Sequence, residues 1–156
     1  MAIRRVISGG QTGVDRVALD VALERGIEVG GWCPAGRRAE DGEIPDRYPL
    51  RETPASDYEQ RTEWNVWEAD GTLILTVGPP GGGTAYTVRI AEAVGRPCRV
   101  VDLAELTTAE EISEAADAVH RWLEEKGIVT LNVAGPRASR DSGIAERATR
   151  FLQQLL

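Results

Sequence analysis

The chain has 156 residues, of which 42% are hydrophobic and 28% charged, a composition typical of a globular protein with one domain. Its 25 acidic residues outnumber the 18 basic ones and give a formal net charge of −7, so the surface as a whole repels nucleic acid. No segment approaches the roughly 18 consecutive apolar residues of a membrane-spanning helix, and we expect neither nucleic acid nor a membrane as a partner.

The first third of the chain contains two short strands, a helix and a long loop. Residues 3–7 are an apolar run that ends at glycine, which predicts a first strand. Apolar residues then recur at helical spacing as far as Gly26, a typical helix stop. A second short strand is expected over 27–30. A loop rich in glycine, proline and charge follows over 30–56, and loops of this length in a compact domain are usually functional or mobile.

Strands and helices alternate in the rest of the chain. The expected helices cover about 56–68, 85–94, 107–125 and a last segment that begins at Ser139 or Ser142 and ends at Leu155. The expected strands cover 72–77, 99–103 and 128–133. Alternation of this kind predicts a parallel sheet covered on both faces. We therefore expect residues 1–156 to form one α/β domain, a Rossmann-like three-layer sandwich. Its five strands should take the order 2-1-3-4-5, with a crevice between the first and third strands.

Three of the strand-to-helix turns are rich in glycine, serine and threonine. They are Ser8-Gly9-Gly10-Gln11-Thr12-Gly13 (the first turn), Gly81-Gly82-Gly83-Thr84 with Thr87 one turn later (the second turn), and Ala134-Gly135-Pro136-Arg137-Ala138-Ser139 (the third turn). They follow the first, third and fifth strands, so all should lie at the carboxyl edge of the sheet. Glycine lets backbone N–H groups approach a ligand, and helix N-termini carry a partial positive charge. The three turns together predict a site for an anionic, phosphate-bearing small molecule.

The first turn is neither the G-x-G-x-x-G fingerprint nor a Walker A loop, because it lacks the lysine of the latter. Ordinary NAD binding and NTP hydrolysis are therefore not indicated. The long loop adds Arg37, Arg38, Glu40 and Asp41, and Arg61 follows later in the chain. These charges either pair with one another in solvent or belong to a lid over the crevice, and the sequence leaves both interpretations open. Glu40 and Asp41 are the candidate catalytic residues.

These motifs resemble those of the molybdenum carrier family, a branch of the SLOG/YpsA-like Rossmannoid superfamily. The resemblance covers nearly the whole chain. The segments that carry it are Ser8-Gly9-Gly10-Gln11-Thr12-Gly13-Val14-Asp15-Arg16, Gly30-Gly31-Trp32-Cys33-Pro34, Gly36-Arg37-Arg38-Ala39-Glu40-Asp41-Gly42, Tyr48-Pro49-Leu50, Arg61-Thr62-Glu63-Trp64-Asn65-Val66, Gly82-Gly83-Thr84 with Thr87, and Gly135-Pro136-Arg137-Ala138-Ser139.

The resemblance implies a ligand crevice and a cargo. The cargo would be the molybdenum cofactor (molybdopterin) or molybdate. The cofactor's phosphate suits a helix N-terminus, and its pterin ring needs amide partners such as Gln11 or Asn65. The resemblance also implies a homo-oligomer, either a dimer or a tetramer. The candidate ligand-binding residues are Ser8, Gly9, Gly10, Gln11, Thr12, Gly13, Arg16, Arg37, Arg38, Asn65, Gly82, Gly83, Thr84, Thr87, Gly135, Pro136, Arg137 and Ser139.

The sequence differs from that of a related enzyme family at one position that is important for catalysis. The LOG-type phosphoribohydrolases share a P-G-G-x-G-T-x-x-E motif, and in this chain Thr87 stands at the position of the catalytic glutamate. Threonine cannot act as a general acid or base there, although Glu40, Asp41 or Asp15 could supply a carboxylate. We therefore expect a binding or carrier protein. A sensor of nucleotide derivatives such as ADP-ribose or NAD, and a nucleotide phosphoribohydrolase without the usual glutamate, remain alternatives.

The cysteines and the N-terminus bear on compartment and metal binding. Cys33 and Cys98 are far apart and match no metal-ligand spacing, and His120 is the only histidine, so no metal site is expected. Two free thiols suit a reducing compartment. The first residues read as a strand and not as a signal peptide, and we expect a cytoplasmic protein.

Overall fold

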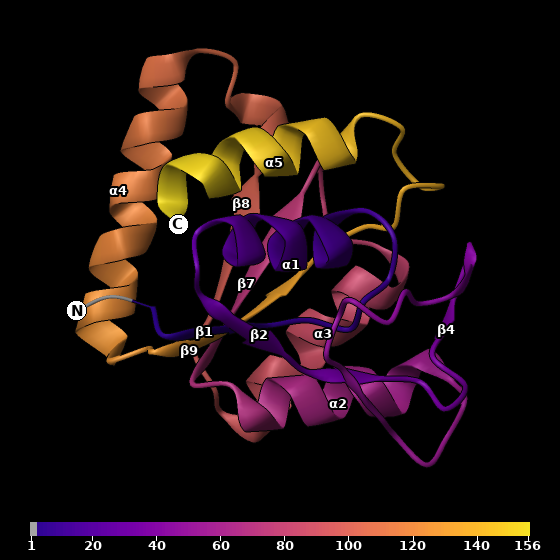
Figure 1. Ribbon diagram of the computed structural model, residues 1–156. Helices are drawn as coiled ribbons and strands as arrows, with labels where there is room; N and C mark the ends of the chain where they lie inside the picture. The colour runs from indigo at the N-terminus through magenta and orange to yellow at the C-terminus, as the bar shows by residue number, and fades with distance from the viewer. Residues whose placement is uncertain (1–2) are drawn as a thin grey trace.

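The computed structural model describes residues 3–156, and a five-stranded sheet lies at its centre (Figure 1). The strands are β1 (Arg5–Ile7), β2 (Glu28–Gly30), β7 (Gly71–Thr76), β8 (Cys98–Asp102) and β9 (Thr130–Ala134). They stand in the order β2-β1-β9-β7-β8, and every neighbouring pair is parallel. The expected α/β, Rossmann-like fold with a five-stranded parallel sheet is confirmed.

The place of the last strand differs from the expected order 2-1-3-4-5. β9 pairs with β1 on one side and with β7 on the other, so the five strands stand in the order 2-1-5-3-4. If β9 is counted as the first strand, the same sheet reads 3-2-1-4-5, the usual order of a doubly wound Rossmann sheet. The chain therefore has the connectivity of a circularly permuted Rossmann fold. The crevice expected between the first and third strands lies instead around β9.

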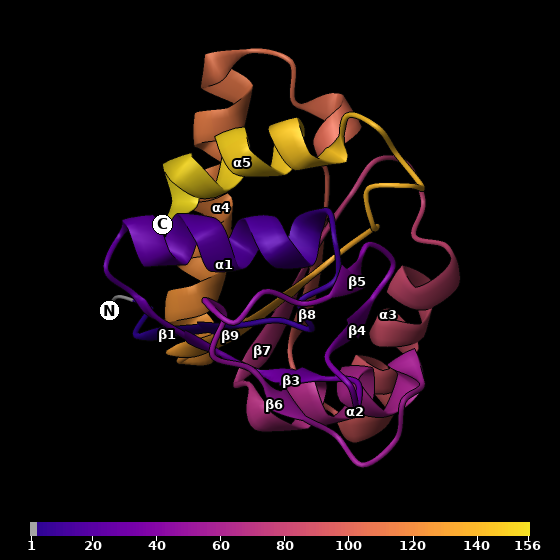
Figure 2. The same ribbon diagram turned by 45° about the vertical axis from the view of Figure 1, so that its right-hand side comes forward.

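Helices cover both faces of the sheet (Figures 1 and 2). On one face α1 (Val14–Glu24) packs against α5 (Ile144–Leu155), which packs in turn against α4 (Ala109–Lys126). On the other face α2 (Tyr58–Glu68) packs against α3 (Gly82–Val94). No helix within residues 3–156 is both long enough and apolar enough to cross a membrane.

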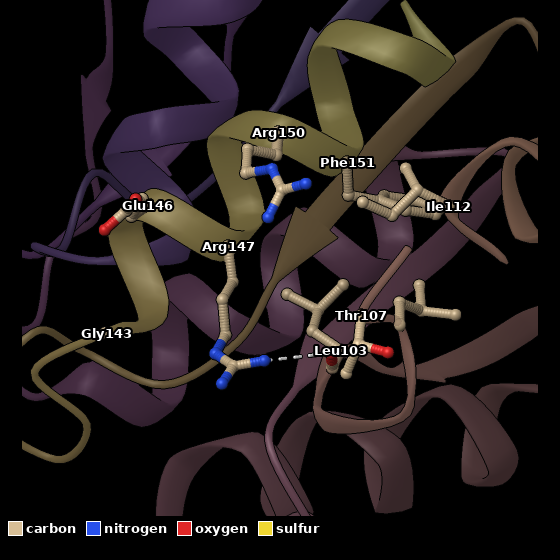
Figure 3. Close-up of a pocket in the computed structure, with 9 residues that line it drawn as sticks. Leu103, Thr107, Ile112, Gly143, Glu146, Arg147, Arg150 and Phe151 are labelled. Atoms are coloured by element: carbon tan, nitrogen blue, oxygen red, sulfur yellow. Dashed lines mark hydrogen bonds between the residues drawn. The ribbon is translucent and has the colours of Figure 1, made fainter. Parts of the chain in front are cut away.

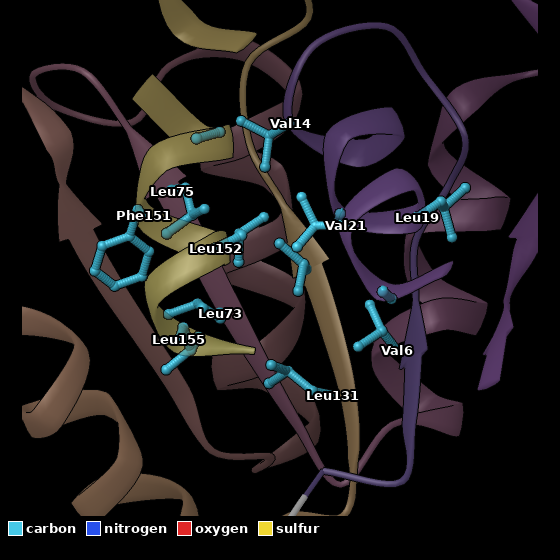
Figure 4. Packing of buried hydrophobic residues seen from close by; sticks show 14 of the residues in the cluster. Val6, Val14, Leu19, Val21, Leu73, Leu75, Leu131, Phe151, Leu152 and Leu155 are labelled. Atoms are coloured by element: carbon cyan, nitrogen blue, oxygen red, sulfur yellow. The ribbon is translucent and has the colours of Figure 1, made fainter. Parts of the chain in front are cut away.

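The main core lies between the sheet and the helices α1 and α5 (Figure 4). Leu73 and Leu75 of β7 and Leu131 of β9 are fully buried, and they meet Leu152 of α5 in the same cluster. All six residues of β7 are buried, as expected of a central strand covered on both faces. Burying one leucine side chain contributes about 1.5–3 kcal/mol, so these central strands fix the carboxyl edge from which the turns extend.

The long loop is ordered and contains four two-residue strands. β3 (Trp32–Cys33) pairs with β6 (Arg51–Glu52), and β4 (Arg38–Ala39) forms a hairpin with β5 (Gly42–Glu43) (Figure 2). Tyr48 is fully buried within the loop. The Arg37 guanidinium donates to four loop carbonyls, those of Ile44, Pro45, Tyr48 and Leu50. A buried side chain and one arginine thus give this loop a fixed shape beside the first turn.

Candidate functional site

The first and third turns touch each other at the carboxyl edge of the sheet. Gly13 has φ +81°, and a Cβ at this position would lie 2.3 Å from the carbonyl oxygen of Pro136. The N–H of Val14 donates to that same carbonyl at 3.3 Å. The N–H of Ala138 donates to Thr12 Oγ1 at 3.1 Å. Glycine is therefore required at position 13, because any side chain there would push the two turns apart.

The second turn contributes Thr87 to a small cavity that Gly9 of the first turn also lines. Its glycines Gly82 and Gly83 form the first residues of α3, which begins three residues earlier than the sequence predicts. Thr87, one helical turn later, is buried and donates to the Gly83 carbonyl at 3.0 Å. The cavity has a volume of about 20 Å³, space for about one water molecule. Its lining residues are Gly9, Asp15, Arg61, Thr62, Asn65, Thr87, Asn132 and Ala134.

A carboxylate from the long loop bridges the first and third turns. Glu40 accepts hydrogen bonds from Thr12 Oγ1, from Ser139 N at 3.2 Å and from Ser139 Oγ at 2.5 Å. Arg137 Nε lies 3.8 Å from the same carboxylate. The hydrogen bonds from Ser139, and then that from Thr12, hold the pKa of Glu40 below its usual range. The donors of two predicted turns thus converge on one negatively charged group.

The neighbouring carboxylate, Asp41, fastens the β4–β5 hairpin to the first turn. Arg16 Nη1 lies 2.5 Å from Asp41 Oδ2, and Arg16 Nη2 lies 3.1 Å from Oδ1. Arg16 also donates to the Gly10 carbonyl through Nε and Nη2. The hydrogen bond from Arg16 lowers the pKa of Asp41. Glu40 and Asp41 are therefore both held as anions, and a carboxylate with a lowered pKa is a weak general base.

A different carboxylate has the opposite electrostatic character. Asp15 is 6% exposed, and burial raises its pKa from 3.8 to about 6, although Arg61 pulls the pKa downward. Asp15 Oδ2 accepts from Gln11 N at 3.3 Å and lies 3.5 Å from Arg61 Nη1. Arg61 Nη1 also donates to the Gly9 carbonyl at 3.3 Å. Asp15 and Arg61 therefore close the inner end of the crevice.

The two amide side chains expected to recognise a ring are bonded to the protein itself. Asn65 Oδ1 accepts from Trp32 N at 2.8 Å, and Asn65 Nδ2 donates to Trp32 O at 2.9 Å. Gln11 Oε1 accepts from Thr12 N and from Glu40 N. In this structure both amides position backbone around the crevice.

Several other predicted residues also have structural partners. Ser8 Oγ is buried and donates to the Asp15 carbonyl at 2.8 Å. Arg38 donates to the Ser56 carbonyl, and its guanidinium carbon lies 4.6 Å from the centre of the Tyr58 ring. Arg37 is bound to loop carbonyls, as described above. Arg37 and Arg38 therefore organise the loop, and their predicted contact with ligand stays a prediction.

The outer part of the crevice differs from the prediction at two places. α5 begins at Ile144, five positions beyond Ser139 and two beyond Ser142, so the third turn itself, and not the first turn of α5, presents the Ser139 N–H to Glu40. Arg140 lies beside the second turn, where a Cβ on Gly82 would come within 2.6 Å of Arg140 Nη2. Gly135 has no space for a side chain, because its Cβ would lie 2.2 Å from the Leu75 carbonyl oxygen.

Some cavity-lining residues were not among the sequence candidates. Thr62 and Asn132 belong to this group, and Asp15 and Arg61 were expected only as a spare carboxylate and as one of the loop charges. Asn132 carried a usable signal, since it is a polar residue between two apolar residues of a strand. It is buried and donates to Thr72 Oγ1 at 3.2 Å.

A larger pocket lies away from these turns. It has a volume of about 380 Å³ and is formed by η1 (Leu103–Glu105), α4 and α5 (Figure 3). Arg147 reaches across it and donates to the Leu103 carbonyl at 3.3 Å. None of the predicted site residues lines this pocket. Within residues 3–156, no three histidine, cysteine or acidic side chains come together in a way that could hold a metal ion.

The fold and the turns define a Rossmann-like protein of circularly permuted connectivity. The model of the circularly permutated YpsA SLOG family matches residues 6–156, and the chain belongs to this family. The chain is also similar to a protein from Syntrophus aciditrophicus SB, provisionally named a molybdenum carrier protein, whose crystal structure is known at 1.45 Å resolution. The two chains are 45% identical, with a TM-score of 0.94 over 99% of this chain and 96% of that one. Comparison with curated proteins gives no match.

Proposed function

We propose that this protein binds an anionic, phosphate-bearing small molecule at the three turns, and that the molybdenum cofactor is its first candidate cargo. The observation that carries the proposal is the convergence of donors from the first and third turns on the Glu40 carboxylate. The name of the similar protein from Syntrophus aciditrophicus SB supports the choice of cargo.

The position of the third turn supports an oxyanion site. The turn follows β9, which takes the place of the first strand in the standard Rossmann order. In that fold the first strand-to-helix turn is where backbone N–H groups meet the phosphates of a nucleotide. Here Ser139 supplies both an N–H and a hydroxyl, and Arg137 supplies a cation. This donor set needs no lysine.

The same donors fit the oxygen atoms of the proposed cargo. A phosphate, or the oxo groups of molybdate, would accept from the N–H and O–H groups that now bind Glu40. The cavity of about 20 Å³ is too small for a ring, so a pterin or a nucleobase would sit at the outer rim. Direct ligation of molybdenum by protein side chains is not part of the proposal, because residues 3–156 bring no suitable cluster together.

A thermal-shift panel tests the proposal. The probes are molybdate, AMP, ADP-ribose and NAD, tested on the wild type and on Gly83→Val. Nothing lies within 4 Å of a Cβ at Gly83, so the variant should fold and obstruct only the rim. We expect at least one probe to raise the melting temperature of the wild type and to lose that effect in the variant. No shift with any probe would refute the proposal, and an equal shift in the variant would remove the second turn from the site.

Mass spectrometry of ligand released from the purified protein identifies the cargo. A pterin or molybdenum signal supports the carrier function. An adenine signal favours the nucleotide sensor, which uses the same phosphate chemistry. Release of ribose phosphate from nucleotides by the protein would favour the phosphoribohydrolase.

A further inference from the structure

The hydrogen-bond donors that an anionic ligand would need already bind the Glu40 carboxylate. Glu40 belongs to the loop between β4 and β5, and its side chain enters the gap between the first and third turns. One of its oxygens, Oε1, accepts from Thr12 Oγ1 and Ser139 N, and the other, Oε2, accepts from Ser139 Oγ. Arg137 Nε stands 3.8 Å from Oε2. The two oxygens of one carboxylate therefore accept hydrogen bonds from three donor groups and form an ion pair with one arginine.

The hairpin can keep its place when the Glu40 side chain moves. Its backbone is held by the hydrogen bond from Glu40 N to Gln11 Oε1 at 2.9 Å and by the pair of Arg16 with Asp41. Neither contact involves the Glu40 carboxylate. The Glu40 side chain is 21% exposed, so a rotation about its own bonds takes the carboxylate into solvent.

We propose that Glu40 is a built-in competitor, whose carboxylate occupies the subsite for the ligand's terminal oxyanion and must leave when the ligand binds. The inference rests on the proposed function and narrows the ligand class to one with a terminal phosphate monoester or a free oxoanion. A tethered competitor acts at an effective concentration in the millimolar range. A ligand displaces it by presenting more charge and more oxygens to the same donors.

The need to displace the Glu40 carboxylate distinguishes phosphate monoesters from phosphodiesters as ligands. A terminal phosphate monoester has three free oxygens and a charge close to −2, so it satisfies the three donors and the Arg137 cation better than a carboxylate does. A phosphodiester, including the linked phosphates of NAD and ADP-ribose, has only two free oxygens per phosphorus and a charge of −1. It offers no advantage over Glu40. The wild-type protein should therefore prefer monoesters to diesters.

The test is isothermal titration of the whole chain with AMP, with the methyl ester of AMP and with inorganic phosphate. The variants are Glu40→Ala, Glu40→Gln and the control Glu43→Ala, which removes a charge from the same hairpin. We expect Glu40→Ala to bind AMP at least about tenfold more tightly than the wild type, because a competitor with several charge-assisted hydrogen bonds is gone. Glu43→Ala should bind AMP like the wild type. The preference for AMP over its methyl ester should shrink in Glu40→Ala.

The direction of the change in AMP affinity tests whether Glu40 competes with the ligand. Weaker binding of AMP by Glu40→Ala would show that Glu40 contacts the ligand, and unchanged binding would show that it occupies no shared subsite. Either result overturns the inference while the proposed function stands. Glu40→Gln keeps the size of the side chain and should also bind AMP more tightly, which covers the case in which Glu40→Ala does not fold. Failure of AMP and phosphate to bind the wild type and every folded variant overturns the inference, and the proposed function falls with it only if molybdate, ADP-ribose and NAD also give no thermal shift.

Discussion

Replacement of Asp15 by asparagine should stabilise the protein by an amount that grows with pH. Burial raises the pKa of Asp15 from 3.8 to about 6, so the folded protein holds this proton at pH values where the unfolded chain has lost it. A raised carboxyl pKa means that stability falls as pH rises between these two values. The shift of about 2 units corresponds to about 3 kcal/mol, at 1.36 kcal/mol per unit. Asparagine has the same shape and does not titrate.

Urea unfolding in half-unit steps from pH 4 to pH 8 measures the effect. The difference in unfolding free energy, variant minus wild type, should rise by about 2.5 kcal/mol across this range and level off above pH 7. Titrations common to both proteins, such as that of Glu40, cancel in the difference. Asp117→Asn, on the exposed face of α4, is the control for loss of one surface charge. A difference that stays constant, or that falls as pH rises, would refute the reasoning, because the attraction of Arg61 would then outweigh burial.

Four further substitutions test the roles of two glycines, one arginine and one helix cap in the stability of the fold. Gly13→Ala should lower the unfolding free energy by about 2 kcal/mol or more, because of its left-handed φ and its contact with the third turn. Gly83→Ala, where a Cβ would lie in open space, should change the unfolding free energy little. If urea titrations gave the same loss for Gly83→Ala as for Gly13→Ala, the contact of Gly13 with the third turn would not be the cause. Arg37→Lys should speed thermolysin cleavage of the long loop, since lysine lacks the planar fork that reaches four carbonyls; an unchanged rate would count against the arginine. Thr108→Ala breaks the capping box with Glu111 at the start of α4 and should cost about 1 kcal/mol, so an unchanged melting temperature would contradict that role.

The elements of the fold follow from local patterns, but their order in space does not. The apolar runs at β1, β7 and β9 and the helical spacing in α4 and α5 predicted strands and helices close to where they lie. Which strands become neighbours depends on contacts between residues far apart in the sequence. The parallel pairing of β9 with both β1 and β7 depends on such long-range contacts. No local sequence pattern predicts it.

For the site as well, local sequence patterns predict some features, and contacts between distant residues determine the others. Glycine patterns located the three turns, because left-handed and crowded backbone positions require glycine, as at Gly13. The partners of the charged loop residues could not be assigned, because Glu40 lies 99 positions before Ser139 in the sequence and meets it only in the folded chain. The raised pKa of Asp15 also has no sequence signature, since burial alone causes it.

The central position of β9 in the sheet affects how the chain folds during its synthesis, because β9 is the last strand to be made. All other strands of the sheet precede β9, and they form two separate parallel pairs, β2 with β1 and β7 with β8. Without β9 the other strands can form only these two separate pairs, each with open edges of the kind that is prone to unwanted association. Translation of the final segment joins the halves and creates the third turn in the same event. A prematurely terminated product therefore lacks both a continuous sheet and three of the four groups that surround the Glu40 carboxylate, namely Ser139 N, Ser139 Oγ and Arg137 Nε.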